Sequence, residues 1–153
     1  MKKFFSSLCV VLLTIVLGIG LYILYNNYNQ KTLFIQTLTK KISLSYEVAD
    51  TPEKQSIGLM YRQEMPNNHS MIFIFPEPQM IYMWMKNTYI PLDMIFFDET
   101  GKITHIHQNA KPHDLSIISS QQNAKGVIEV NAGFVNTHHI SVGHQIIYSG
   151  LNH

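Results

Sequence analysis

A polar corner between two apolar stretches holds most of the side chains in this sequence that could bind a ligand. It lies within residues 80–101, which read MIYMWMKNTYIPLDMIFFDETG. Trp84 could form a wall on which a ligand stacks, while Lys86, Asn87 and Asp93 could supply polar contacts. These residue types, gathered within ten positions, predict a binding site for a small molecule or a protein partner.

The same corner also has a purely structural interpretation. Asp93 could pair with Lys86 or accept hydrogen bonds from turn amides, and the side chains of Asn87 and Thr88 could bond to nearby backbone groups. Pro91 would then fix the direction in which the chain returns. The sequence leaves both interpretations open.

Arg62 and Glu129 are the next candidates for the site. Glu129 lies in the apolar stretch GVIEV at residues 126–130, where a carboxylate is costly unless it is paired or faces solvent. We therefore expect Arg62 to pair with Glu129 or with Asp93. A strand in which Glu129 faces solvent fits the pattern equally well.

Metal binding and catalysis are alternatives of different kinds. Met80, Met83 and Met85 carry thioethers that suit Cu(I), although the same side chains are common core fillers. Asp93 and Glu129 could act as an acid–base pair in a hydrolase. The sequence contains no activated-serine motif and no glycine-rich phosphate loop, so we favour a binding protein without a resident metal or cofactor.

Short apolar stretches separated by turn signals must position these residues. They predict many strands and one or two short helices, and hence a mostly β domain, either a β-sandwich or a barrel-like fold. One helix is expected from Pro52 to about Met60, because Asp50 or Thr51 can cap it and Pro52 suits its first position. Ile57 and Leu59 or Met60 would be buried in this helix. The predicted strands are 42–48, 70–75, 80–87, 92–98, 102–108, 126–130 and 145–149.

Several segments of this domain together resemble the DUF192 (UPF0127) family. The matching segments are Ala49–Glu53 with Gly58–Met60 and Arg62, Met71–Pro76, Trp84–Thr88 with Ile90–Asp93, Gly101–Ile103 and Glu129–Gly133. The resemblance implies a compact, mostly β domain, often found behind a signal or anchor segment in bacterial and archaeal envelopes. The family has no established biochemical role, so the resemblance assigns no catalytic residue.

The N-terminal segment predicts a membrane anchor. Lys2 and Lys3 precede an uncharged apolar run over residues 4–25, long enough as a helix to cross a bilayer. We expect residues 1–30 to be a signal-anchor segment, 31–41 a tether and 42–150 the folded domain. The two lysines favour a cytoplasmic N-terminus, which would place the domain on the periplasmic or extracellular side of the membrane. Cleavage after this segment would instead make the domain a secreted protein.

Charge and cysteine content narrow the partners. From Lys31 onward the chain has nine Lys or Arg residues and ten Asp or Glu residues, and no basic patch stands out. Nucleic acid is therefore not an expected partner. The membrane, through residues 4–25, and an unknown small molecule or envelope protein are the expected ones. Cys9 is the only cysteine, so the domain has no internal disulfide and depends on its core.

Overall fold

A computed structural model describes residues 14–21 and 31–150 of the chain. Residues 1–30 and 31–153 form two separate units, and each is described by itself. In the first unit, residues 14–21 are helical, and the rest of the predicted anchor at 4–25 lies outside the described residues. Among the helices in the described parts of the chain, none has the length and apolar character needed to span a membrane.

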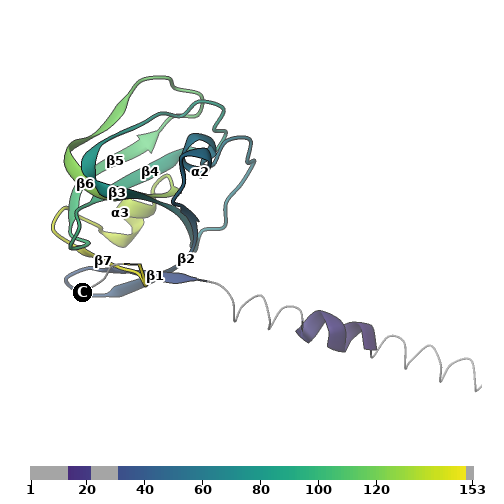
Figure 1. The fold of residues 1–153 in the computed structure, drawn as a ribbon. Coiled ribbons are helices and arrows are strands. Elements are labelled where there is room, and N and C mark those ends of the chain that lie inside the picture. Colours follow the sequence, from purple (N-terminus) through teal and green to yellow (C-terminus); the bar gives the residue numbers. More distant parts are fainter. Residues whose placement is uncertain (1–13, 22–30, 151–153) are drawn as a thin grey trace, which may run out of the picture. The chain divides into compact units, whose positions relative to one another are not determined.

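The second unit is built on a single seven-stranded sheet (Figure 1). Its strand order is β5-β4-β6-β3-β2-β1-β7, and all neighbours are antiparallel except the parallel pair of β2 and β3. The elements are β1 Thr32–Gln36, β2 Lys41–Ala49, α2 Pro52–Ile57, β3 His69–Met83, β4 Leu92–Phe97, β5 Ile103–Ala110, β6 Ile118–Asn131, α3 Phe134–His138 and β7 Gln145–Ile147.

The sheet curls until its two edges meet at one end. The Ile103 amide, at the start of β5, donates to the His144 carbonyl over 2.8 Å, and the Ile146 amide in β7 donates to the Gly101 carbonyl over 2.7 Å. Figure 1 shows α3 between the two arms of this curl. The prediction of a mostly β domain with few short helices is confirmed. Of the two expected architectures, the half-barrel is the one observed, and the sandwich is wrong.

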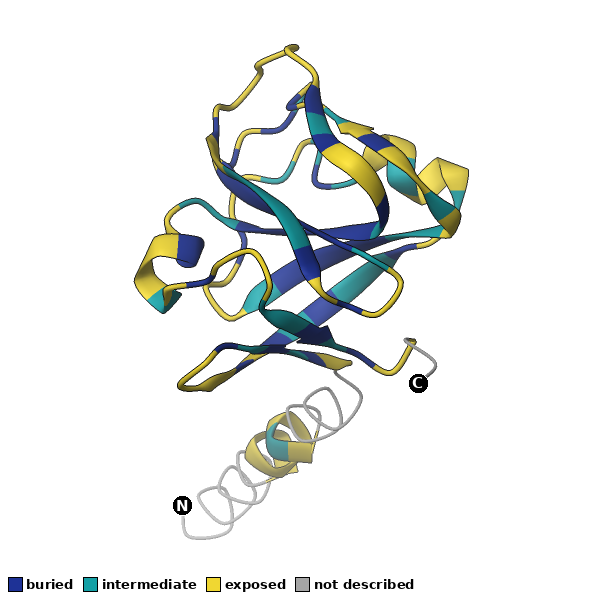
Figure 2. Cartoon of the chain, turned by 90° about the vertical axis from the view of Figure 1, so that its left-hand side faces the viewer, coloured by how far each residue is buried: buried dark blue, intermediate teal, exposed yellow. Residues whose placement is uncertain are grey.

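Strand alternation gives the sheet two apolar faces, and both are covered. In β4, Ile95 and Phe97 belong to the core enclosed by the curl, while Met94 and Phe96 belong to a second core on the outer face. All six residues of β4 are buried. Figure 2 shows buried residues, in dark blue, along the strands in the middle of the domain. The outer core is closed by segments outside the sheet, including Leu59 and the residues around Met85 and Ile90.

Helix α2 begins where the sequence predicts and ends sooner. Thr51 caps it, since its hydroxyl accepts the Lys54 amide at 3.3 Å. Gly58 then takes a positive φ of 49°, which stops the helix before Met60. Because the chain turns there, Leu59 is buried, whereas Ile57, expected in the core, is 57% exposed.

Two further segments differ from their predictions. Residues 31–41, expected as a tether, contain β1, which pairs with both β2 and β7 and so belongs to the sheet. The predicted strand at 70–75 and the first part of the one at 80–87 belong to a single strand, β3, which ends at Met83. Pro76 and Pro78 do not end β3, because its pairing with β6 is irregular between Ile74 and Gln79 and needs no amide from them.

Candidate functional site

The polar residues of the predicted corner turn away from one another. The Lys86 ammonium lies over the Trp84 ring, 5.1 Å from its centroid. Asn87 adopts a positive φ of 53°, and its side-chain amide donates to the Tyr61 hydroxyl at 2.9 Å. Lys86 and Asn87 therefore contact other residues at the surface of the corner, and neither contacts Asp93.

Asp93 is a buried structural group. Its carboxylate accepts the amide of Asn109 at 2.9 Å and that of Val135 at 3.0 Å. It thereby joins the end of β5 to the first turn of α3, and its side chain has no exposed surface. Among the roles predicted for Asp93, the structure therefore shows the one in which its carboxylate accepts backbone amides.

Glu129 is also buried, on the other face of the sheet. Its neighbours in β6, Ile128 and Val130, point into the enclosed core, so Glu129 points into the outer one and is only 4% exposed. Asp93, paired with Val130, lies on the enclosed side. The sheet therefore separates the two carboxyl groups, and the acid–base pair of the hydrolase alternative does not form.

No described residue forms a hydrogen bond or ion pair with the Glu129 carboxyl group. Burial without a compensating charge raises its pKa to about 8. At neutral pH the group is therefore mainly protonated. Among the described residues, no fully buried side-chain oxygen or nitrogen lacks a hydrogen-bond partner, so the Glu129 carboxyl group keeps some access to its surroundings. A nearly buried carboxyl without a protein partner is costly, which marks Glu129 as a candidate functional group.

Glu129 opens onto a narrow cleft, which we name the Glu129 cleft. It lies between the 55–60 segment and the start of the corner, and its cavity volume is about 30 Å³. That volume admits water or one small polar group. The lining residues are Gln55, Ser56, Ile57, Gly58, Leu59, Met60, Phe73, Met83, Trp84, Thr88 and Glu129.

Of the residues predicted for the site, only Trp84 and Glu129 line this cleft. The sequence did not predict that residues 55–60 form one wall of the cleft. Gly58 was the one residue whose type could have indicated it. A Cβ at Gly58 would lie 3.0 Å from the Phe73 ring, so the absence of a side chain lets this segment close on the sheet. A glycine near the end of a predicted helix, in a motif shared with the family, indicates such a close approach.

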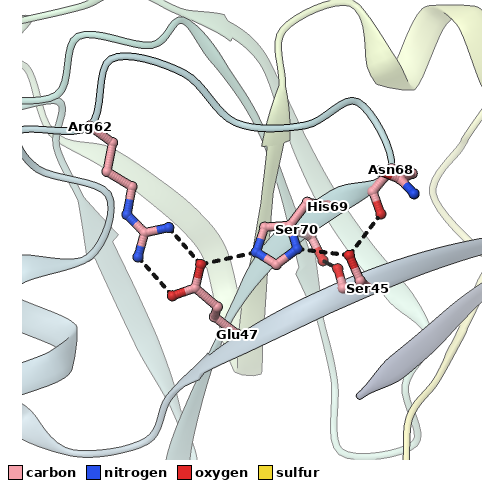
Figure 3. Close-up of polar contacts among 6 residues, drawn as sticks. All are labelled: Ser45, Glu47, Arg62, Asn68, His69 and Ser70. Carbon is pink, nitrogen blue, oxygen red and sulfur yellow. Dashed lines mark hydrogen bonds and ion pairs between the residues drawn. The ribbon is translucent and has the colours of Figure 1, made fainter. Parts of the chain in front are cut away.

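Arg62 binds Glu47, and the predicted pair with Glu129 or Asp93 is wrong. Its two terminal nitrogens donate to the two oxygens of Glu47 at 2.5 and 2.7 Å (Figure 3). The guanidinium, followed by His69, lowers the pKa of Glu47 to about 2. The sequence could not show this pair, because Glu47 reads as one polar position in an alternating strand.

His69 extends this pair into a chain of polar contacts. One ring nitrogen, Nε2, lies 3.0 Å from Glu47, and the other, Nδ1, lies 2.8 Å from the Ser45 hydroxyl (Figure 3). Serine, histidine and glutamate occur together in hydrolases, but Ser45 is not part of the Glu129 cleft and also bonds to the Asn68 carbonyl. The contacts fasten the segment before β3 onto β2.

The three methionines of the copper alternative lie in different environments. Met85 is fully buried in the outer core, Met80 is 37% exposed, and Met83 lines the Glu129 cleft. Core packing accounts for Met85 without a metal. Over the described ranges 14–21 and 31–150, no group of three or more His, Cys, Asp or Glu residues could hold a metal ion.

We predict that Asp93→Ala lowers the free energy of unfolding by about 3 kcal/mol, because two buried amides lose their acceptor. Asp93→Asn keeps one acceptor oxygen and should cost less. Lys86→Ala, on the exposed side of the corner, should change stability by no more than about 0.5 kcal/mol. Urea unfolding of the three variants tests this; equal losses for Asp93→Ala and Lys86→Ala would show that Asp93 is not a structural anchor.

Glu129 should also make the stability depend on pH. Between pH 4.5 and about 8 the folded protein holds a proton on Glu129 that the unfolded chain releases. The free energy of unfolding should therefore fall as pH rises through this window, by up to about 1.4 kcal/mol per pH unit from this group.

Glu129→Gln is the matched control, because it keeps the shape and cannot titrate. Urea unfolding at pH 5, 6, 7 and 8 should show a stability difference between wild type and variant that changes with pH. Histidine titrations occur in both proteins and cancel. A constant difference would mean that Glu129 is ionised in the folded state throughout.

Comparison with known proteins identifies the family. The sequence model of DUF192, described as "Uncharacterized ACR, COG1430", matches residues 34–148. No match is found among curated proteins.

Two solved structures show the same fold. One is a proposed transcription regulator from Sinorhizobium meliloti 1021, with 40% identity and a TM-score of 0.78 over 80% of this chain and 95% of that one. The other is a protein of unknown function from Novosphingobium aromaticivorans DSM 12444, with 30% identity and a TM-score of 0.75 over 76% of this chain and 84% of that one. Since the family match spans most of the sequence and includes the motifs that predicted it, the chain belongs to the DUF192 family.

Proposed function

We propose that this domain binds a small molecule through the Glu129 cleft, and that residues 4–25 anchor it to the membrane with the domain on the outer side. The observation that carries the binding proposal is the buried Glu129 carboxyl, which has no partner among the described residues and faces a cleft. A ligand that donates to this carboxyl would offset the free energy that its burial costs.

The cleft favours a ligand with a primary amino group. A cavity of about 30 Å³ has room for one small donor and not for a whole organic molecule. An ammonium group fits this size and would supply the cationic partner that Glu129 does not have within the protein. Its binding would lower the pKa of Glu129 and so favour the ionised carboxylate. The ammonium and Glu129 would form a buried ion pair.

The rest of such a ligand would lie on the lip of the cleft. Trp84 is 45% exposed and Ile57 is exposed beside it, so the lip offers apolar and aromatic surface. An alkyl or aryl amine combines a small cationic head with an apolar body that suits this surface. The proposal keeps Trp84 and Glu129 from the predicted site, whereas Lys86, Asn87, Asp93 and Arg62 do not line the cleft.

The proposal does not extend to nucleic acid. The Sinorhizobium protein is described as a proposed transcription regulator, but residues of this chain from Lys31 onward carry one more acidic than basic side chain. Binding to DNA depends largely on neutralising phosphates with Lys and Arg. The charge of this domain gives no support for such a partner.

Trp84 is the only tryptophan of the chain, so its fluorescence reports directly on the cleft. With the full chain in detergent, we expect benzylamine and hexylamine to change this fluorescence saturably. Benzyl alcohol and hexanoate should have little effect. Glu129→Gln should weaken amine binding about tenfold or more, because it removes the charge from the buried partner.

Glu53→Gln is the matched control, since it removes one negative charge from an exposed position on α2. It should leave amine binding unchanged. Binding that survives in Glu129→Gln, or the absence of any saturable response to the amines, would contradict the proposed ligand class.

The anchor is tested by fractionation. Membranes of cells that produce the full chain should retain the protein after an alkaline wash, because an apolar run of this length partitions into the bilayer. A protein released at full length would contradict the anchor. Release in a form shortened at the N-terminus would show cleavage and a secreted domain.

A further inference from the structure

A second cavity lies beside α3 and shares no residue with the Glu129 cleft. Its volume is about 320 Å³, which falls in the range of small-molecule sites. We name it the α3 cavity; its lining residues are Asn67, Asn131, Ala132, Gly133, Phe134, Thr137 and His138. A Cβ at Gly133 would meet no atom within 4 Å, so this wall stands free of other side chains.

The α3 cavity is lined without formal charge. None of its residues is Asp, Glu, Lys or Arg. Its one titratable group, His138, has its pKa lowered by burial and by the nearby Lys40 and His139, which favours the neutral ring. The lining itself carries no counter-charge for a charged ligand, and the nearby Lys40 ammonium already contacts Nδ1 of His138, so the cavity suits a neutral ligand.

The lining is nevertheless rich in hydrogen-bonding groups. The Asn131 side-chain amide donates to the Met65 carbonyl at 2.8 Å and to Asn67 Oδ1 at 3.3 Å, which fixes its orientation and leaves its own oxygen as an acceptor. The Thr137 hydroxyl makes no hydrogen bond to another described residue. The lining therefore offers both donors and acceptors to a ligand.

His138 adds a donor. Lys40 Nζ lies 3.5 Å from its Nδ1, so Nδ1 is the acceptor of this contact and the proton of the neutral ring is on Nε2. The ring also packs against Phe134, with 4.2 Å between ring centroids. The cavity thus combines an aromatic wall with a polar rim.

We propose that the α3 cavity binds a neutral polyhydroxylated ring, of the kind found in pyranose sugars. Such a ring has hydroxyl groups that both donate and accept, and these match the amide oxygen of Asn131, the hydroxyl of Thr137 and Nε2 of His138. Its C–H faces can pack against the Phe134 and His138 wall. A volume at the lower end of the range for ligand sites fits one ring.

Saturation-transfer NMR on the full chain tests this, in a detergent without a sugar headgroup. The probes are glucose, N-acetylglucosamine and myo-inositol as neutral compounds, with glucosamine and glucuronate as their charged counterparts. We expect saturation transfer to at least one neutral probe and weaker transfer to the charged ones. Ala132→Leu should abolish it, because the larger side chain would fill the cavity.

Thr137→Val should weaken the binding of that probe about fivefold or more through the loss of one hydrogen bond. Asn136→Ala is the control, since Asn136 is exposed on α3 and does not line the cavity. Thermal unfolding confirms that each variant is folded.

Glu129→Gln should leave sugar binding intact, which separates this site from the proposed amine site. Three results would overturn the proposal: no transfer to any neutral probe at about 50 mM, a preference for a charged probe, or unchanged binding in a folded Ala132→Leu variant.

Discussion

The buried carboxylate of Asp93 is the interaction on which the rest of the domain depends. It accepts one amide at the end of β5 and another in the first turn of α3, and it sits on β4, whose side chains are all buried. These contacts hold α3 inside the curl, where Phe134 and Val135 complete the enclosed core. A buried charge with two oriented amides is tolerated because its hydrogen bonds replace those to water.

Glu129 shows the opposite solution on the other face of the same sheet. It is nearly as buried as Asp93, but no described residue donates to it, and the resulting protonation is the form that its surroundings favour. The fold thus holds one carboxyl group that completes a scaffold and one that is left open at a cleft. The presence of hydrogen-bond partners thus identifies Asp93 as a structural residue, and their absence identifies Glu129 as a candidate binding residue.

The strand alternation and turn signals predicted the fold class and the start of α2, with its cap at Asp50 or Thr51, because these depend on neighbouring residues. The motifs predicted the family. The site was predicted only in part: Trp84 and Glu129 share a cleft, whereas the partners of Arg62 and Asp93 are set by strands far apart in the sequence. The strand β1 was missed because its polar surroundings resemble a linker, and only pairing with β7 as well as β2 gives it a place.

The closure of the curled sheet constrains how the chain can fold. β1 forms a hairpin with β2 early in the sequence, but its other edge is covered only by β7, near the C-terminus. During synthesis from the N-terminus, this edge stays unpaired until β7 has been made, and it can meanwhile pair with other chains. The same long-range contacts make folding slow relative to a fold built from local ones. In a chain of this architecture, the edge of β1 is therefore the part of the sheet most open to pairing with other chains until β7 covers it.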